Sequence, residues 1–253
     1  MTPSVGNFMT TPEWLSFGDA RELVRAAAAD WLGAVARLLE AGRNPCVALS
    51  GGRIAGTLFS ELRVRVEAAK LDLSRVEFFW ADERCVSPDD IESNYRTAHQ
   101  QLFGPLALRG HRLHRIRGEW EPESAAEAAA AELRRIAPGD AGGYPVLDLV
   151  LLGMGEDGHV ASLFPDESEA SVLAPAVYRA VTAPKPPPRR VTLGYGVLAA
   201  AREVWVLISG GSKASALTAS LQPGCRLPLA RVLRSRARTR ILTDLSGNPA
   251  ALV

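Results

Sequence analysis

Apolar and polar residues alternate along this chain in two patterns, one with the spacing of a helix and one typical of a buried strand. In residues 19–40 the apolar positions fall on one helical stripe, with Asp19 suited to begin the helix and Gly42 to end it. Short apolar runs predict strands at residues 45–50, 76–80, 113–116, 147–152, 177–182, 191–195, 203–209 and 240–243.

Further helical patterns lie between these runs. They cover residues 54–67, 94–103, 123–136 and 212–221. This alternation predicts an α/β fold: a single doubly wound, mostly parallel sheet with helices on both faces, of the Rossmann-like kind. No repeat, charge block or linker divides the pattern, so we expect one domain over residues 1–253.

The composition is that of a soluble enzyme domain. With 47% hydrophobic residues the chain can bury a large core, and its 29 basic and 28 acidic side chains leave a net charge of +1. No strong field would therefore draw it to nucleic acid or to a membrane. Three unpaired-looking cysteines and the lack of a signal-peptide pattern predict a reducing, cytoplasmic location. We expect a monomer or a small homo-oligomer.

The turn after the apolar run 147–152 carries the strongest candidate chemistry. Three glycines there let the backbone turn sharply, and two carboxylates and His159 follow the strand closely. In an open α/β sheet, ligands bind beyond the carboxyl ends of the strands, so His159 is our first candidate for a catalytic group, although a lone histidine is more often structural. Asp157 either orients the imidazole or caps a helix that begins near His159, and the two roles are compatible.

Two other turns carry glycines between a strand and a helix. Ser50, Gly51 and Gly52 form the first, and the SGGSK stretch that ends at Lys213 forms the second. Backbone N–H groups at such a turn, together with the positive helix end, can hold a phosphate dianion, and a lysine adds a point charge. The simpler interpretation of the first turn is a glycine turn that binds no ligand. The simpler interpretation of the second is a turn whose lysine is solvated.

An acidic turn follows the strand predicted at 76–80. Asp82, Glu83 and Arg84 stand there, and they form either a surface ion pair or part of a site at the end of that strand.

Taken together, these motifs resemble the glucosamine-6-phosphate isomerase/6-phosphogluconolactonase family, and within it the 6-phosphogluconolactonases. The residues that carry the resemblance are ALSGG, FFWADERCVSPDDIESNYR, LDLVLLGMGEDGHVASLFPD, PKPPPRRVTL and SGGSKA, in this order. The related glucosamine-6-phosphate deaminases have a different sequence after DGH and a different acidic turn. Arg84 and the stretch 161–165 therefore favour the lactonase.

The resemblance implies hydrolysis of 6-phosphoglucono-1,5-lactone to 6-phosphogluconate in the oxidative pentose phosphate pathway, without a metal or an organic cofactor. It gives His159 the role of the base that activates water, with Asp157 as its orienting partner. The glycine turns and basic residues would hold the phosphate. Besides Arg84, the implied substrate site contains Ser50, Gly51, Gly52, Arg53, Asp82, Arg190 and Lys213.

The first glycine turn departs from the family pattern. It usually reads SGGST followed by proline, whereas Arg53 stands here after the two glycines. Arg53 either replaces the lost hydroxyl contacts by its charge or points to solvent. Arg189 and Arg190 create a second ambiguity, and the spacing to Thr192 favours Arg190.

Three other classes of function fit the sequence less well. A metal-dependent hydrolase is disfavoured because the pair His111 and His114 lacks a third ligand nearby. A sugar-phosphate sensor would keep the fold and bind without turnover, but no basic DNA-binding segment is evident. A dinucleotide-binding domain would require the GxGxxG spacing, which neither glycine turn provides.

Overall fold

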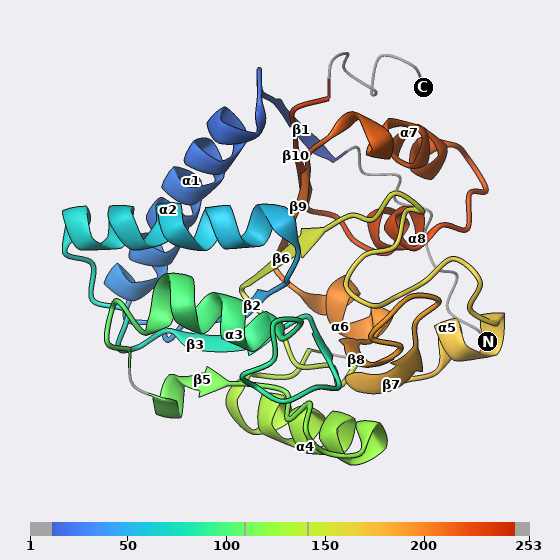
Figure 1. Cartoon of the computed structure of the whole chain (residues 1–253), viewed down its shortest axis with the longest axis horizontal. Helices are drawn as coiled ribbons and strands as arrows, with labels where there is room; N and C mark the ends of the chain where they lie inside the picture. Colours follow the sequence, from blue (N-terminus) through green and yellow to red (C-terminus); the bar gives the residue numbers. More distant parts are fainter. Residues whose placement is uncertain (1–11, 109, 141, 246–253) are drawn as a thin grey trace.

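Seven strands form the main sheet, in the order β1-β10-β9-β6-β2-β3-β5 (Figure 1). The structure is a computed structural model, and it describes residues 12–108, 110–140 and 142–245. Every neighbouring pair in this sheet is parallel, which confirms the predicted α/β fold with a mostly parallel sheet. The strands are β1 (Glu13–Ser16), β2 (Cys46–Leu49), β3 (Glu77–Trp80), β5 (Leu113–His114), β6 (Leu149–Gly153), β9 (Glu203–Ile208) and β10 (Thr239–Thr243).

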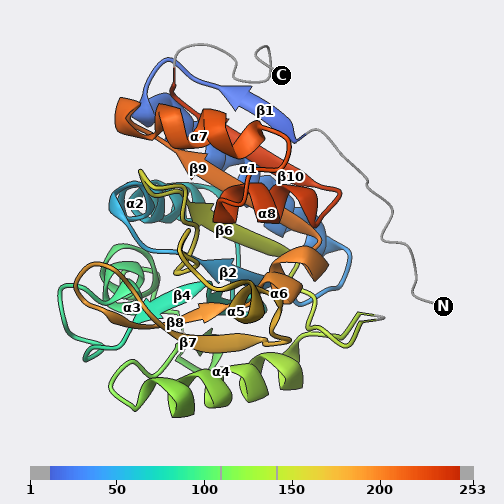
Figure 2. The ribbon, with the colours of Figure 1, turned by 90° about the vertical axis from the view of Figure 1, so that its right-hand side faces the viewer.

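Helices cover both sides of this sheet, as expected for a doubly wound fold. Helices α1 (Ala20–Glu40) and α2 (Arg53–Ala69) lie on one side (Figure 1). On the other side lie α6 (Tyr195–Ala200), α7 (Ala214–Leu221) and α8 (Pro228–Arg234), which face the viewer in Figure 2. The remaining α-helices of the described residues are α3 (Asn94–Ala98), which continues as a π-helical turn over His99–Phe103, α4 (Pro122–Ile136) and α5 (Glu169–Leu173). Short 3-10 helices lie at Gly110–Arg112 and Gly211–Lys213.

In helix α1, local sequence determines where the helix begins, where it ends and which face is buried. The Asp19 side chain accepts a hydrogen bond from the backbone N–H of Glu22 at 2.8 Å, which satisfies one of the free donors of the first turn. Gly42 follows the helix with a φ of +76°, a conformation that favours glycine. The stripe buried against the sheet includes Leu23, Ala27 and Trp31, as the spacing predicted.

A second, three-stranded sheet was not predicted. It has the order β4-β8-β7 and contains β4 (Asp82–Arg84), β7 (Tyr178–Thr182) and β8 (Arg189–Leu193), all antiparallel. The runs expected at 177–182 and 191–195 are strands, but the second one begins earlier and ends at Leu193. Helix α4 packs against this small sheet. β4 escaped prediction because its three residues are polar, so no apolar run marks it.

The order of the strands places a crevice between β2 and β6. From β2 the sheet continues through β3 to β5 in one direction, and from β6 it continues through β9 and β10 to β1 in the other. At such a point the helices that leave neighbouring strands go to opposite sides of the sheet, and the space between the strand ends stays open. The turns after β2 and β6 carry two of the predicted glycine motifs. Within the described ranges, no helix is long and apolar enough to cross a bilayer.

Candidate active site

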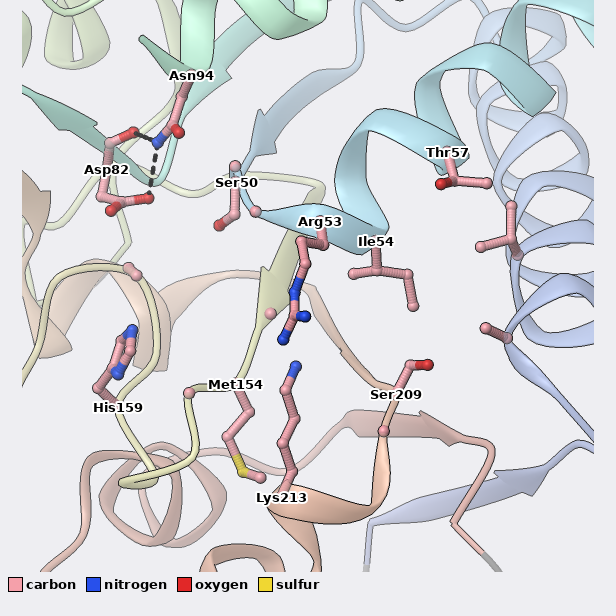
Figure 3. Close-up of a pocket in the computed structure, with 18 of the residues that line it drawn as sticks. Ser50, Arg53, Ile54, Thr57, Asp82, Asn94, Met154, His159, Ser209 and Lys213 are labelled. Carbon is pink, nitrogen blue, oxygen red and sulfur yellow. Dashed lines mark hydrogen bonds between the residues drawn. The ribbon is translucent and has the colours of Figure 1, made fainter. Parts of the chain in front are cut away.

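A cavity of about 550 Å³ opens at the carboxyl end of the main sheet (Figure 3). The turns that follow β2, β6 and β9 line it, together with β4 and β8 of the small sheet. Of the site residues predicted from the sequence, all but Asp157 line this one cavity: Ser50, Gly51, Gly52, Arg53, Asp82, Arg84, His159, Arg190 and Lys213.

His159 faces the cavity from the turn after β6. Asp157 Oδ1 contacts the ring Nδ1 of His159 and also accepts a hydrogen bond from its backbone N–H at 3.1 Å. A Cβ at Gly155 would lie only 2.0 Å from that Nδ1, so glycine is required there for the ring to fit. The Phe164 ring packs on the imidazole with centroids 5.0 Å apart. The ring is thus held between a carboxylate and an aromatic face.

Asp157 does not cap a helix, so that part of its predicted role is wrong. The residues after His159 form turns and isolated bridges, and Ala161 has a left-handed φ of +50°. Local hydrogen bonds to Asp157 replace the helical turn. Partial burial raises the pKa of Asp157, but the hydrogen bonds and the charge of His159 outweigh it and lower the pKa to about 2. The carboxylate is therefore ionised at neutral pH.

Asp82, Glu83 and Arg84 form β4, and hydrogen bonds from this strand hold α3 beside the site. Glu83 is buried and accepts hydrogen bonds from the backbone N–H groups of Asn94 and Tyr95, each at 2.8 Å. Asp82 is also buried; Ser162 Oγ donates to its Oδ2 at 2.6 Å, and Asn94 Nδ2 donates to its backbone oxygen at 2.9 Å. Asp82 is thus fixed at the cavity wall, where Figure 3 shows it beside Asn94.

The first glycine turn leaves polar groups open to the cavity. Ser50 Oγ is buried and has no hydrogen-bond partner among the residues that the structure describes. Gly52 has a φ of +101°, and α2 begins after it without a side-chain cap. Because the first N–H groups of a helix have no partner within the helix, this end is suited to bind an anion.

Gly51 is a position where a single methyl group should be costly. An added Cβ would lie 1.8 Å from Asn94 Oδ1, so Gly51→Ala must displace Asn94 from Asp82. We expect a loss of about 2 kcal/mol in the free energy of unfolding, or roughly 5 °C in Tm, measured by thermal denaturation. Gly211→Ala, in the second glycine turn, is the control, because nothing lies within 4 Å of its Cβ position. Equal Tm values for the two variants would contradict the expected clash.

Arg53 and Lys213 point toward each other across the cavity from the turns after β2 and β9 (Figure 3). Arg53 therefore does not simply extend into solvent. Burial lowers the pKa of Lys213, and the nearby Arg53 lowers it further, while Asp244 and Glu156 act in the opposite direction. Two cations that converge in this way create a site for an anion.

Arg84 and Arg190 form a second cationic pair, because they are directly opposite each other in the β4–β8 ladder. Arg190 is 3% exposed, and its guanidinium lies 5.8 Å from the centre of the Phe164 ring. Burial lowers the pKa of Arg190, and the positive charge of Arg84 lowers it further. Like charges in directly opposed positions destabilise a sheet, and Glu92 Oε2, 3.5 Å from Arg84 Nη1, offsets part of this repulsion. Arg189 is exposed and pairs with Glu121 at 3.2 Å, so Arg190 is the arginine at the cavity.

The family profile described as glucosamine-6-phosphate isomerases/6-phosphogluconolactonase matches residues 18–241 of the chain. The chain belongs to this family. It is 34% identical over 241 residues to a 6-phosphogluconolactonase of Streptomyces coelicolor, covering 92% of each chain. It is 37% identical over 213 residues to one of Homo sapiens, covering 80% of this chain and 82% of that one.

Solved structures agree with the sequence matches. The structure titled 6-phosphogluconolactonase from Trypanosoma cruzi is similar with a TM-score of 0.82 and 26% identity, over 94% of this chain and 96% of that one. The resemblance to 6-phosphogluconolactonases that the motifs indicated is thus confirmed, and so is the enzyme class, a hydrolase.

Sequence reasoning missed other residues of this lactonase-like site. Asn94 and Ser162 were quoted within motifs but not recognised as the partners of Asp82. The SNY stretch behind DER was the available signal for Asn94. No pattern pointed to the residues of α1 and α2 that line the far part of the cavity, which are Ala20, Arg21, Val24, Ile54 and Thr57.

Proposed function

We propose that this protein hydrolyses 6-phosphoglucono-1,5-lactone to 6-phosphogluconate, a step of the oxidative pentose phosphate pathway. Relatives that span most of the chain are named 6-phosphogluconolactonase. The observation that carries the proposal is that His159, held by Asp157, lines the same cavity as two pairs of cations. A base for water and a clamp for a phosphorylated substrate are the two things that this hydrolysis needs.

In this proposal His159 is the general base. Its contact to Asp157 through Nδ1 keeps the ring proton on Nδ1, so Nε2 is free to accept a proton. Nε2 takes a proton from a water molecule as the water oxygen attacks the lactone carbonyl carbon. The tetrahedral intermediate then expels the ring oxygen, which takes the proton back from the imidazolium. The products are a carboxylic acid, which ionises, and a free hydroxyl, so atoms and charge balance.

The cations divide between the two ends of the substrate. Arg53, Lys213 and the N–H groups of the first glycine turn hold the phosphate, because they converge where α2 begins. Arg190, near Phe164, and Arg84, opposite it in the β4–β8 ladder, stabilise the negative charge that develops on the lactone oxygen. Asp82 accepts hydrogen bonds from the sugar hydroxyls. These roles are supported by position in the cavity and by charge.

The Asp157→Asn variant tests the orienting role. Asparagine still accepts from Nδ1 but no longer stabilises an imidazolium, so we expect kcat to fall at least about tenfold, the lower end of the loss for a partner that orients a histidine. Because the pKa of Asp157 is lowered to about 2, its carboxylate is ionised over the whole working range. The loss should therefore be measurable at pH 8.5 from initial rates. Wild-type kcat of Asp157→Asn at that pH would contradict this role.

No metal or cofactor takes part in the proposed reaction, and Arg84 and Arg190 supply the positive charge. We expect full activity after treatment with EDTA and exhaustive dialysis, assayed in metal-free buffer. A loss of rate that added Zn²⁺ or Mg²⁺ restores would refute this part of the proposal.

The odd number of cysteines, without close pairing in the sequence, supports our further proposal that the protein acts in the cytoplasm.

The deciding experiment uses freshly prepared lactone and couples the product to 6-phosphogluconate dehydrogenase. Spontaneous opening of the lactone is fast enough to matter, so the rate without enzyme is subtracted in every run. Acceleration by the wild type supports the proposal. No acceleration, together with release of ammonia from glucosamine 6-phosphate, would assign the other activity in the family's name.

A further inference from the structure

The cavity continues beyond the two cations that hold the phosphate. Figure 3 shows Ile54 and Thr57 of α2 on the opposite side of Arg53 and Lys213 from His159. The same cavity is lined from α1 as well, although α1 contributes none of the residues assigned to the lactone. We call this far part the α1 compartment, defined by Ala20, Arg21, Val24, Ile54 and Thr57.

The α1 compartment adds positive charge without a compensating carboxylate. Arg21 makes no ion pair or hydrogen bond through its side chain within the described part of the chain. Among the described residues, Asp82 is the one carboxylate in the lining of the cavity. Its two carboxylate oxygens accept hydrogen bonds from Ser162 and Asn94. A single phosphate dianion is balanced by Arg53 and Lys213, so the charge of Arg21 remains available.

We propose that the α1 compartment is a second anion subsite, which binds the outer phosphoryl group of a diphosphate whose other phosphoryl group lies between Arg53 and Lys213. This inference rests on the proposed phosphate site. The ligand class is inorganic diphosphate and diphosphate monoesters. The half-buried apolar side chain of Ile54, which lines the same compartment, suits the carbon portion of such an ester. Ligands of this class compete with the phosphorylated lactone, because both occupy the Arg53–Lys213 position.

The test is titration calorimetry with inorganic phosphate and inorganic diphosphate at fixed pH and ionic strength. We expect the wild type to bind diphosphate at least tenfold more tightly than phosphate. Arg21→Ala and Arg21→Gln should reduce that ratio to about twofold or less, with the affinity for phosphate changed by less than a factor of two. Arg25→Ala is the matched control, because Arg25 is an exposed arginine one turn further along α1 and outside the cavity lining.

Three results would overturn the inference. The first is a wild type that binds diphosphate no more tightly than phosphate. The second is an equal loss of diphosphate affinity in the Arg21 variants and in Arg25→Ala, which would indicate a general effect of net charge. The third is an equal loss for both ligands in the Arg21 variants. Calorimetry needs no turnover, so diphosphate preference without lactone hydrolysis supports the subsite and refutes the proposed reaction, while hydrolysis without preference does the reverse.

Discussion

The His159→Ala variant should lose about three orders of magnitude in kcat for lactone hydrolysis, with KM changed only a few-fold. A positioned general base typically contributes 10²- to 10⁴-fold, and in the proposed mechanism His159 transfers the proton twice, once from water and once to the departing ring oxygen. The imidazole touches Phe164 and Asp157 but carries none of the proposed phosphate contacts. The loss should therefore appear in the chemical step rather than in binding.

The measurement is the dehydrogenase-coupled assay with the spontaneous rate subtracted. His111→Ala is the control, since His111 is an exposed histidine outside the cavity lining and its loss should leave the rate unchanged. An unchanged Tm of His159→Ala would show that the lost rate does not come from unfolding. Wild-type turnover in His159→Ala would remove the histidine from the mechanism.

The strands of the main sheet were the most predictable part of the fold, because burial on both faces leaves a local mark. Residues 46–49 and 149–152 are wholly buried, and a short apolar run is what such burial requires. The order of the strands leaves no such mark. The position of β2 between β3 and β6 depends on pairings between distant segments. The sequence supports only the general rule that consecutive elements tend to be neighbours.

Elements that tertiary partners stabilise escaped prediction. β4 has the sequence Asp-Glu-Arg, and it is a strand because it pairs with β8, more than a hundred residues later. Short helices such as α5 and α6 have only five and six residues, too few for a periodic pattern to stand out. At β1, Trp14 pairs with Ile241 at the far edge of the sheet, and four residues give little signal by themselves.

In the candidate site, too, the residues set by local sequence were predicted and those set by contacts between distant segments were not. Residues that directly follow strands were found, because every strand of a parallel sheet delivers its carboxyl end to the same edge. The contact from Ser162 to Asp82 joins segments 80 residues apart, and no spacing rule predicts it. The helix that Asp157 was expected to cap is absent because Asp157 bonds to His159 instead. The spacing to Thr192 predicted Arg190 rather than Arg189 for the site, and Arg190 lines the cavity, while its neighbour in the strand points to the other face.

Replacing either of the two converging cations, Arg53 and Lys213, should weaken substrate binding. For Lys213→Met we expect KM to rise about 30-fold, since a hydrogen bond to a charged group contributes roughly 1.5–3 kcal/mol. For Arg53→Met we expect a smaller rise, about tenfold, because Arg53 is the more exposed of the two. In both variants kcat should stay within a few-fold of the wild type, as both cations lie away from His159 in Figure 3.

The double variant separates one shared phosphate from two independent contacts. Two cations that bind the same dianion are coupled, so the loss of binding free energy on removing the second cation differs from the loss on removing the first. Arg53 also lowers the pKa of Lys213, which means that part of each charge's effect in the free enzyme is mutual repulsion. We therefore expect the free-energy changes calculated from KM to depart from additivity by at least about 0.5 kcal/mol. Strict additivity, or an unchanged KM in Arg53→Met, would place Arg53 outside the phosphate site and leave Lys213 to bind it with the first glycine turn.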